Sequence, residues 1–142
     1  MSGPAVFGQP YSASADVVGR IVTVLQGTSD RRGLYLQDDL RSRAVRAGDI
    51  HELMLTDTEV DLGDTVNRVG LIAFFLVEEP GVLIVGSRVQ AGDQMIGTLA
   101  GFDETHMPNH QNICVQGSDL VDGRGLNLRL GDEVRFEFGV ST

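Results

Sequence analysis

The stretch LNLRLGDEVRFEF, residues 126–138, carries the clearest structural pattern of the chain. Apolar and polar residues alternate in both of its halves, and this period of two is typical of strands with one buried face. A two-residue turn would place Leu128 opposite Arg135 and mix apolar with charged side chains. A three-residue loop over residues 131–133 places Leu128 opposite Phe136 and keeps one face apolar. We therefore predict a hairpin in this second register.

Glycine and aspartate mark the ends of further predicted strands. A Gly-Asp pair begins at positions 48, 63, 92 and 131, each time shortly before an apolar or β-branched residue. Such repeated turn-then-strand patterns are typical of small barrels and sandwiches. The sequence predicts strands over residues 17–26, 34–36, 50–55, 66–77, 94–102 and 113–116, and a hairpin that joins residues 66–77 to 82–85 through a turn at 79–82. Residues 34–36 are expected to return as the partner of the first of these strands.

The fold expected from these patterns is all-β, a small closed or partly open antiparallel barrel. A β-sandwich is one alternative. An α+β fold with one short helix near residues 38–47 is the other, because Leu40, Ala44 and Ala47 suit a short helix there. We expect residues 1–15, rich in Gly, Pro, Ser and Ala, to form a flexible arm, and residues 16–142 to form a single β-barrel-like domain.

The composition narrows the classes of function. The net charge of -9 opposes binding along a phosphate backbone, so we expect no nucleic-acid partner. All eleven basic residues are arginine, which excludes lysine Schiff-base chemistry and a phosphate-loop lysine. Residues 30–32, Asp-Arg-Arg, are predicted to be a solvated hairpin tip.

The single cysteine and the lengths of the apolar runs indicate the cellular compartment of the protein. Cys114 cannot form an intramolecular disulfide, and its apolar neighbours predict that it packs as a small hydrophobic residue. No secretory signal is visible, and the longest nearly apolar run, residues 69–77, is far too short for a membrane helix. We therefore expect a cytoplasmic protein with no membrane partner.

The polar stretch DETHMPNHQN, residues 103–112, lies between two predicted strands and holds two of the three histidines. Pro108 prevents a regular helix through the stretch, so His106 and His110 do not form an i, i+4 pair. In an extended strand the two positions would be roughly 13 Å apart. A functional role for both imidazoles therefore requires a loop that folds back on itself.

Two interpretations of this stretch involve no acid-base chemistry. In the first, its side chains satisfy the backbone of a turn, and the histidines lie at the surface. In the second, His106 and His110 join His51 and Glu52, or a carboxylate of the loop, to bind a divalent transition metal such as Zn, Fe or Mn. The closely spaced His-x-His pattern of cupin barrels is absent, which weakens the metal hypothesis.

The third interpretation is metal-free acid-base chemistry, in which Asp103 or Glu104 orients His106 or His110. On this basis we predict a small-molecule-binding β-barrel protein, and, if it is an enzyme, one of isomerase, cyclase or hydrolase type. The alternative is a non-catalytic binding or assembly module that forms a homodimer through exposed strand edges. A homo-oligomer is expected in either case, because apolar residues 71–77 need cover on both faces.

Overall fold

The computed structural model describes residues 15–138, and strands are the only long-range regular structure in them. This confirms the predicted all-β class, and none of these residues forms a helix long and apolar enough to span a membrane. The predicted arm lies almost wholly outside the described residues. In chain order the strands are β1 (Val17–Val24), β2 (Thr28–Ser29), β3 (Leu34–Tyr35), β4 (Ser42–Val45), β5 (Ile50–Thr56), β6 (Thr65–Val66), β7 (Val69–Glu79), β8 (Gly81–Ile84), β9 (Arg88–Ala91), β10 (Gln94–Asp103), β11 (Asn112–Gln116) and β12 (Glu133–Phe136).

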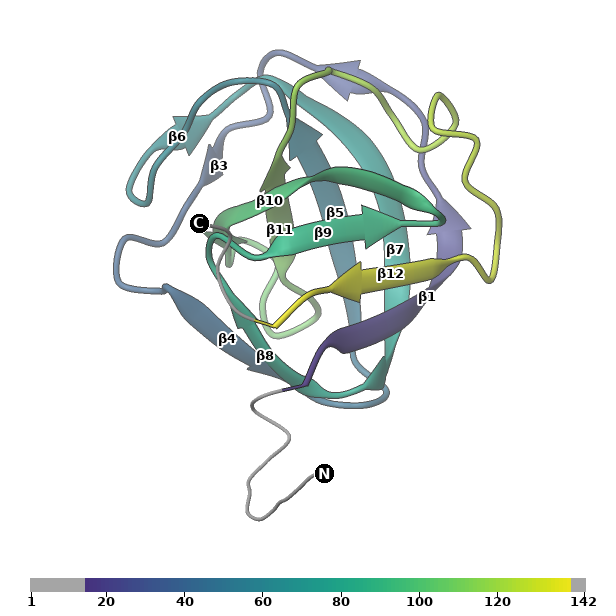
Figure 1. Cartoon of the computed structure of the whole chain (residues 1–142). Helices are drawn as coiled ribbons and strands as arrows, with labels where there is room; N and C mark the ends of the chain where they lie inside the picture. The colour runs from purple at the N-terminus through teal and green to yellow at the C-terminus, as the bar shows by residue number, and fades with distance from the viewer. Residues whose placement is uncertain (1–14, 139–142) are drawn as a thin grey trace.

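Seven strands pair edge to edge into a ring-like sheet (Figure 1). Their order is β1-β12-β9-β10-β11-β5-β7, and β7 pairs again with β1. Each strand of the ring therefore has a partner on both sides, which leaves it no long free edge. One pair departs from the predicted antiparallel pairing, because β5 and β11 run parallel. The long connection between these two strands makes a parallel pair possible.

Two apolar clusters pack on the two faces of this sheet. The inner core receives buried side chains from all seven ring strands, with Phe75, Phe102 and Phe136 as its largest members. The outer core lies on β5, β7, β10 and β11 and is covered by β3 and β6, which pair with each other. The sheet strands between the two cores are apolar on both faces, as the unbroken apolar run of β7 predicted.

The predicted hairpin over residues 126–138 is wrong. Only its second half is a strand, and β12 pairs with β1 and β9 rather than with residues 126–130. Those residues lie in a turn region in which Asn127 has a φ of 59°, a left-handed conformation that interrupts a strand. Leu128 still packs into the inner core, whereas Leu130 is 71% exposed.

Three further local predictions are wrong for related reasons. β8 pairs with β4 and not with β7, and β3 pairs with β6 and not with β1. The edges of β1 and β7 are already occupied by other ring strands, so these short strands find partners elsewhere. The α+β alternative fails because residues 38–47 form a turn and β4, whose Val45 is buried in the inner core.

The connection between β11 and β12 lies directly on the backbone of β7. The Gly123 N–H donates a hydrogen bond of 2.9 Å to the carbonyl oxygen of Leu71. A Cβ at Gly70 would overlap the carbonyl of Val121, and a Cβ at Gly123 would overlap the carbonyl of Ile72. Two glycines therefore allow a backbone-to-backbone contact that any side chain would push apart.

We predict that Gly70→Ala lowers the free energy of unfolding by about 2 to 3 kcal/mol, because the new methyl group meets rigid backbone at Val121. Gly131→Ala is the control. Gly131 has a φ of 85°, and a methyl group added there would have no atom within 4 Å, so this change costs only roughly 1 kcal/mol of backbone strain. Urea unfolding measures both losses, and equal losses would contradict the close contact on β7.

Candidate functional site

A row of side chains crosses four neighbouring strands on the outer face of the ring. Asp103 of β10 lies opposite Asn112 of β11, and Asn112 lies opposite Glu52 of β5. Glu52 in turn lies opposite Phe74 of β7. Directly opposed residues of paired strands share a face. Because the chain neighbours of these residues point into the inner core, the row points outward; these neighbours are Leu53, Phe75, Phe102 and Ile113. We call Asp103, Asn112 and Glu52 the polar row.

Asp103 anchors the segments that cover the polar row. Its Oδ2 accepts a hydrogen bond of 2.7 Å from the Tyr35 N–H. Its Oδ1 accepts hydrogen bonds from the Thr105 N–H and from the Asn112 side chain. Burial alone would raise the pKa of this carboxyl, but the hydrogen bonds outweigh burial and lower it. Asp103 is therefore an ionised structural group that ties β3 and the following loop to the sheet.

The loop of residues 104–111 folds back on itself between β10 and β11. The Asn109 N–H donates a hydrogen bond of 2.9 Å to the carbonyl oxygen of His106, and the Met107–Pro108 peptide bond is cis. The ring centroids of His106 and His110 are 5.1 Å apart in this loop. The structure thus contains the folded-back loop that the functional hypotheses required.

Glu52 and His110 face each other under this loop. The His110 ring stands edge-on to Phe74, and its Nε2 lies 3.7 Å from Glu52 Oε1. The Nη2 of Arg32 lies 3.9 Å from the same oxygen. Glu52 is only 6% exposed, and burial raises the pKa of its carboxyl although the charges of Arg32 and His106 oppose this. Burial and the neighbouring His106 lower the pKa of His110. Both groups are thus shifted toward their neutral forms.

Several polar atoms around Glu52 are buried without a partner. The Nε of Arg32 has no hydrogen-bond partner among residues 15–138. The Nε2 of His110 and the Oδ1 of Asn112 make no hydrogen bond of good geometry within the same residues, although the Asn112 side chain is close enough to act on the pKa of His110. Buried polar atoms are nearly always hydrogen-bonded in folded proteins. This cluster therefore has unused capacity to donate and accept hydrogen bonds.

His51 lies on the other face of β5, because consecutive strand residues project to opposite faces. Its Nδ1 accepts a hydrogen bond of 3.0 Å from the Gln111 N–H. A backbone N–H is always a donor, so Nδ1 carries no proton and Nε2 carries it in the neutral ring. This Nε2 lies 3.6 Å from Asp49 Oδ2. Burial lowers the pKa of His51, although the Asp49 carboxylate opposes this effect. His51 is therefore a neutral hydrogen-bond donor in a fixed position.

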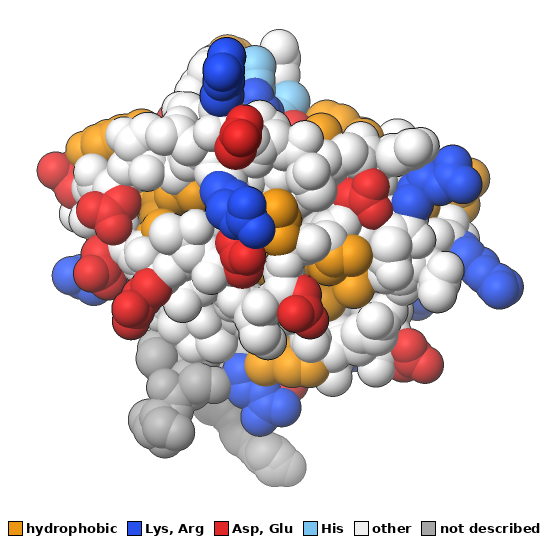
Figure 2. Space-filling view, turned by 90° about the horizontal axis from the view of Figure 1, so that it is seen from above, with side chains coloured by type: hydrophobic (Ala, Val, Ile, Leu, Met, Phe, Trp, Pro, Cys, Tyr) orange, Lys and Arg blue, Asp and Glu red, His pale blue; other side chains and the backbone are white. Residues whose placement is uncertain are grey.

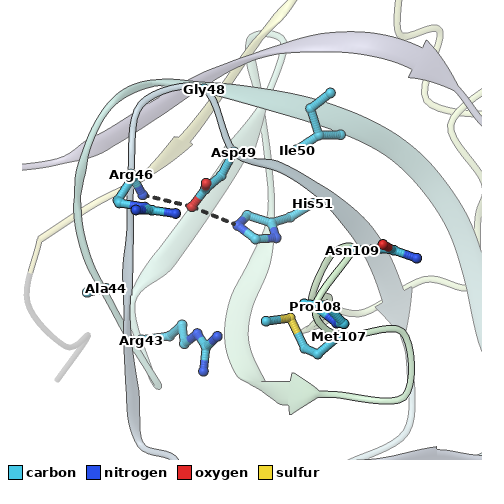
Figure 3. A pocket seen from close by; sticks show the side chains of 10 residues that line it. All are labelled: Arg43, Ala44, Arg46, Gly48, Asp49, Ile50, His51, Met107, Pro108 and Asn109. Atoms are coloured by element: carbon cyan, nitrogen blue, oxygen red, sulfur yellow. Dashed lines mark hydrogen bonds and ion pairs between the residues drawn. The ribbon is translucent and has the colours of Figure 1, made fainter.

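A cavity of about 440 Å³ opens beside His51 (Figure 3). One wall comes from β4 and the turn into β5, which contributes Arg43, Arg46 and Asp49. The other wall is the tip of the folded-back loop, residues 107–109. The Nε2 of His51 is buried and lies 3.6 Å from Asp49 Oδ2, just beyond hydrogen-bond distance. The cavity thus combines charged side chains, an imidazole held beside a carboxylate, and the apolar side chains of Met107 and Pro108.

The four predicted metal ligands do not converge. No group of three or more His, Cys, Asp or Glu side chains within residues 15–138 is placed to hold a metal ion. His51 points to the opposite face of the sheet from Glu52. Coordination through its Nε2 would also require a proton on Nδ1, where the Gln111 N–H already points. Of this set, His110 lies 3.7 Å from Glu52 and His106 lies beside His110, but the three side chains do not converge on one point.

The predicted catalytic residues divide into two pairs. His106 and His110 lie together beside Glu52, whereas Asp103 and Glu104 hold the loop in place. The Oε2 of Glu104 accepts hydrogen bonds of 2.9 Å from both Arg43 and the Gln111 side chain. The carboxylate that faces a histidine of the loop is instead Glu52.

The sequence patterns missed four charged residues of these sites. Arg32 was predicted to be solvated, yet it is half-buried and faces Glu52. The other three are Arg43, Arg46 and Asp49, which line the cavity. The turn at Gly48-Asp49 was the only sequence signal close to them. No local pattern reveals Arg32, because its position depends on the pairing of β2 with β7.

Cys114 is buried in the outer core, as its apolar neighbours predicted. Burial raises the pKa of its thiol to about 12. A thiol that stays protonated at neutral pH is a poor nucleophile. Cys114 is therefore part of the packing and not of the candidate site.

Comparison with known proteins places this chain in a family. A model of a family of unknown function (DUF6917) matches residues 11–137, and the chain belongs to that family. No curated protein and no solved structure matches the chain.

We predict that Asp103→Asn lowers the free energy of unfolding by about 2 to 3 kcal/mol at pH 7, because the carboxylate loses charge-assisted hydrogen bonds. Since folding lowers the pKa of Asp103, its stabilising effect is present above the unfolded pKa and is lost as the pH falls through the folded pKa. The difference between the two proteins should therefore shrink in acid. Urea unfolding from pH 7 down to pH 3 measures it, with the exposed Asp93→Asn as control. A loss that does not depend on pH would contradict this role of the charge.

Proposed function

We propose that this member of the family binds a small molecule in the cavity beside His51. The observation that carries the proposal is the cavity itself, in which Arg43, Arg46 and Asp49 gather beside the His51 ring. The Nε2 of that ring lies 3.6 Å from Asp49 Oδ2, just beyond hydrogen-bond distance, so a small rearrangement would free it for a ligand. The volume of about 440 Å³ also lies within the range of roughly 300–1,000 Å³ that small-molecule pockets occupy.

The walls of the cavity are held in place before any ligand arrives. Backbone hydrogen bonds of 2.8 Å join Gly48 to Val77 and Val77 to Asp49, which fixes the turn against β7. An ion pair of 2.9 Å between Arg43 and Glu104 joins the turn side to the loop side. A site that is already formed loses little conformational entropy on binding. This favours binding over a purely structural role for the turn.

A second candidate function is acid-base catalysis by Glu52 and His110. Burial shifts the pKa of each group toward the neutral form, and groups perturbed in this way gather at functional sites. His106 is exposed, His110 is half-buried and Glu52 is buried, so the three form a path from solvent to a carboxyl group. Such a path suits the transfer of a proton between solvent and a bound molecule.

The binding proposal is tested by thermal unfolding and NMR titration against a library of small polar compounds. A compound that binds the cavity should raise the free energy of unfolding by about 2.7 kcal/mol at 100 times its Kd. His51→Asn keeps an acceptor for the Gln111 N–H and removes the Nε2 donor, so it should weaken binding at least tenfold. His106→Asn makes the same chemical change outside the cavity and should leave the affinity unchanged. Binding that both variants retain in full would refute the proposed site, as would a library without any binder.

The acid-base candidate predicts that Glu52→Gln gains stability relative to the natural protein as the pH rises. Folding raises the pKa of Glu52, so its contribution is fully present below the unfolded pKa and is lost as the pH rises through the folded pKa. The variant should therefore be at least as stable as the natural protein at pH 7. At pH 4 its free energy of unfolding should be lower relative to that of the natural protein. Urea unfolding at both values checks this. If Glu52→Gln is the less stable protein at pH 7, Glu52 is a structural ion-pair partner and the candidate loses its support.

A further inference from the structure

The donors in the cavity are arranged for an anionic group. Arg46 lines the cavity, and its guanidinium forms no ion pair within residues 15–138. His51 adds a donor that cannot become an acceptor, because its Nδ1 is occupied by the Gln111 N–H. Arg43 pairs with Glu104 through Nη1, and its remaining N–H groups are not used in that ion pair. Guanidinium groups bind carboxylates and phosphates through two parallel hydrogen bonds.

The surroundings make this arrangement unusual for the chain. Acidic residues outnumber basic ones by 20 to 11, and Figure 2 shows acidic side chains spread among the basic ones over one face. Two arginines and one aspartate line the cavity, and because Arg43 pairs with Glu104, one charge of each sign remains, on Arg46 and on Asp49. An anionic group would therefore be attracted to Arg46 locally, although the protein as a whole repels anions.

Asp49 places a second requirement on the chemistry of the ligand. Its Oδ2 accepts a hydrogen bond of 2.9 Å from the Arg46 N–H and faces His51 at 3.6 Å, which fixes the carboxylate at the cavity wall. A second anion close to this carboxylate would be repelled unless it brings a donor. A hydroxyl or amino group on the ligand would donate to Asp49 and remove the conflict.

The charge and the walls limit the ligand further. Arg46 is the only cation of the cavity that lacks a close partner of opposite charge within residues 15–138, because Arg43 pairs with Glu104, and this suits a monoanion better than a phosphate dianion. The opposite wall includes Met107 and Pro108 and accommodates a short carbon skeleton. We infer that the ligand is a small organic carboxylate that also carries a hydroxyl or amino group. This inference rests on the proposed function.

NMR titration of the full chain with four small probes tests the inference. Glycerate has both groups, propionate lacks the hydroxyls, glycerol lacks the carboxylate, and inorganic phosphate replaces the carboxylate by a larger charge. We expect glycerate to shift the amide signals of Asp49, His51 and Gln111, and the other three probes to bind at least tenfold more weakly. Arg46→Gln should weaken glycerate binding at least tenfold. Arg31→Gln removes the same charge from an exposed position and should leave the binding unchanged.

The outcomes separate the ligand class from the existence of the site. If glycerol or propionate binds as tightly as glycerate, the ligand does not need both a carboxylate and a hydroxyl group. If phosphate binds more tightly than glycerate, the inference that the ligand is a carboxylate is wrong. Equal losses in the Arg46 and Arg31 variants would show an effect of net charge and would also overturn the inference. If none of the four probes binds while library compounds do bind at His51, the ligand class is wrong and the binding function stands. If no library compound binds either, the ligand class and the proposed binding function are both wrong.

Discussion

The two-residue period of β5 is the constraint on which both candidate sites depend. β5 is hydrogen-bonded to β11 on one edge and to β7 on the other, so it cannot turn to move a side chain from one face to the other. His51 must therefore face the cavity, and Glu52 must lie in the polar row on the opposite face. A shift of one residue in register would exchange the two side chains and would also move Leu53 out of the inner core. The hydrophobic packing of the ring thereby fixes the chemistry on both of its faces.

Much of the fold could be predicted from local patterns, and its pairing could not. Alternation and β-branched runs located the long strands β1, β5, β7 and β10 to within a few residues. The hairpin predictions failed because they paired neighbours in sequence, whereas the ring pairs β1 with β12 and β5 with β11. Residues 126–130 show the limit of the pattern. Their leucines alternate as in a strand, but Asn127 adopts a left-handed conformation and the backbone of residues 126–128 closes turns by hydrogen bonds to residues 122–124.

The candidate site was predicted in part. The polar composition of residues 103–112 and the position of Pro108 correctly indicated a loop between two strands, and the structure brings its two histidines together. Their carboxylate partner, Glu52, comes from a strand about 50 residues away, and only the parallel pairing of β5 with β11 places it there. The homodimer stays a prediction. The need for a partner to cover β7, on which that prediction was based, is smaller in the structure, because the inner core and the outer core already cover both faces of β7 within one chain.

The loop of residues 104–111 is a part of two sites at once. Its tip, residues 107–109, forms a wall of the cavity, and the histidines on either side of that tip lie over Glu52. A ligand that displaces the tip would also move His110, whose pKa is lowered by burial. Thermodynamic linkage makes such an effect reciprocal. For such a ligand, occupancy of the cavity and protonation of His110 are coupled, and the affinity depends on pH through a group that the ligand does not contact.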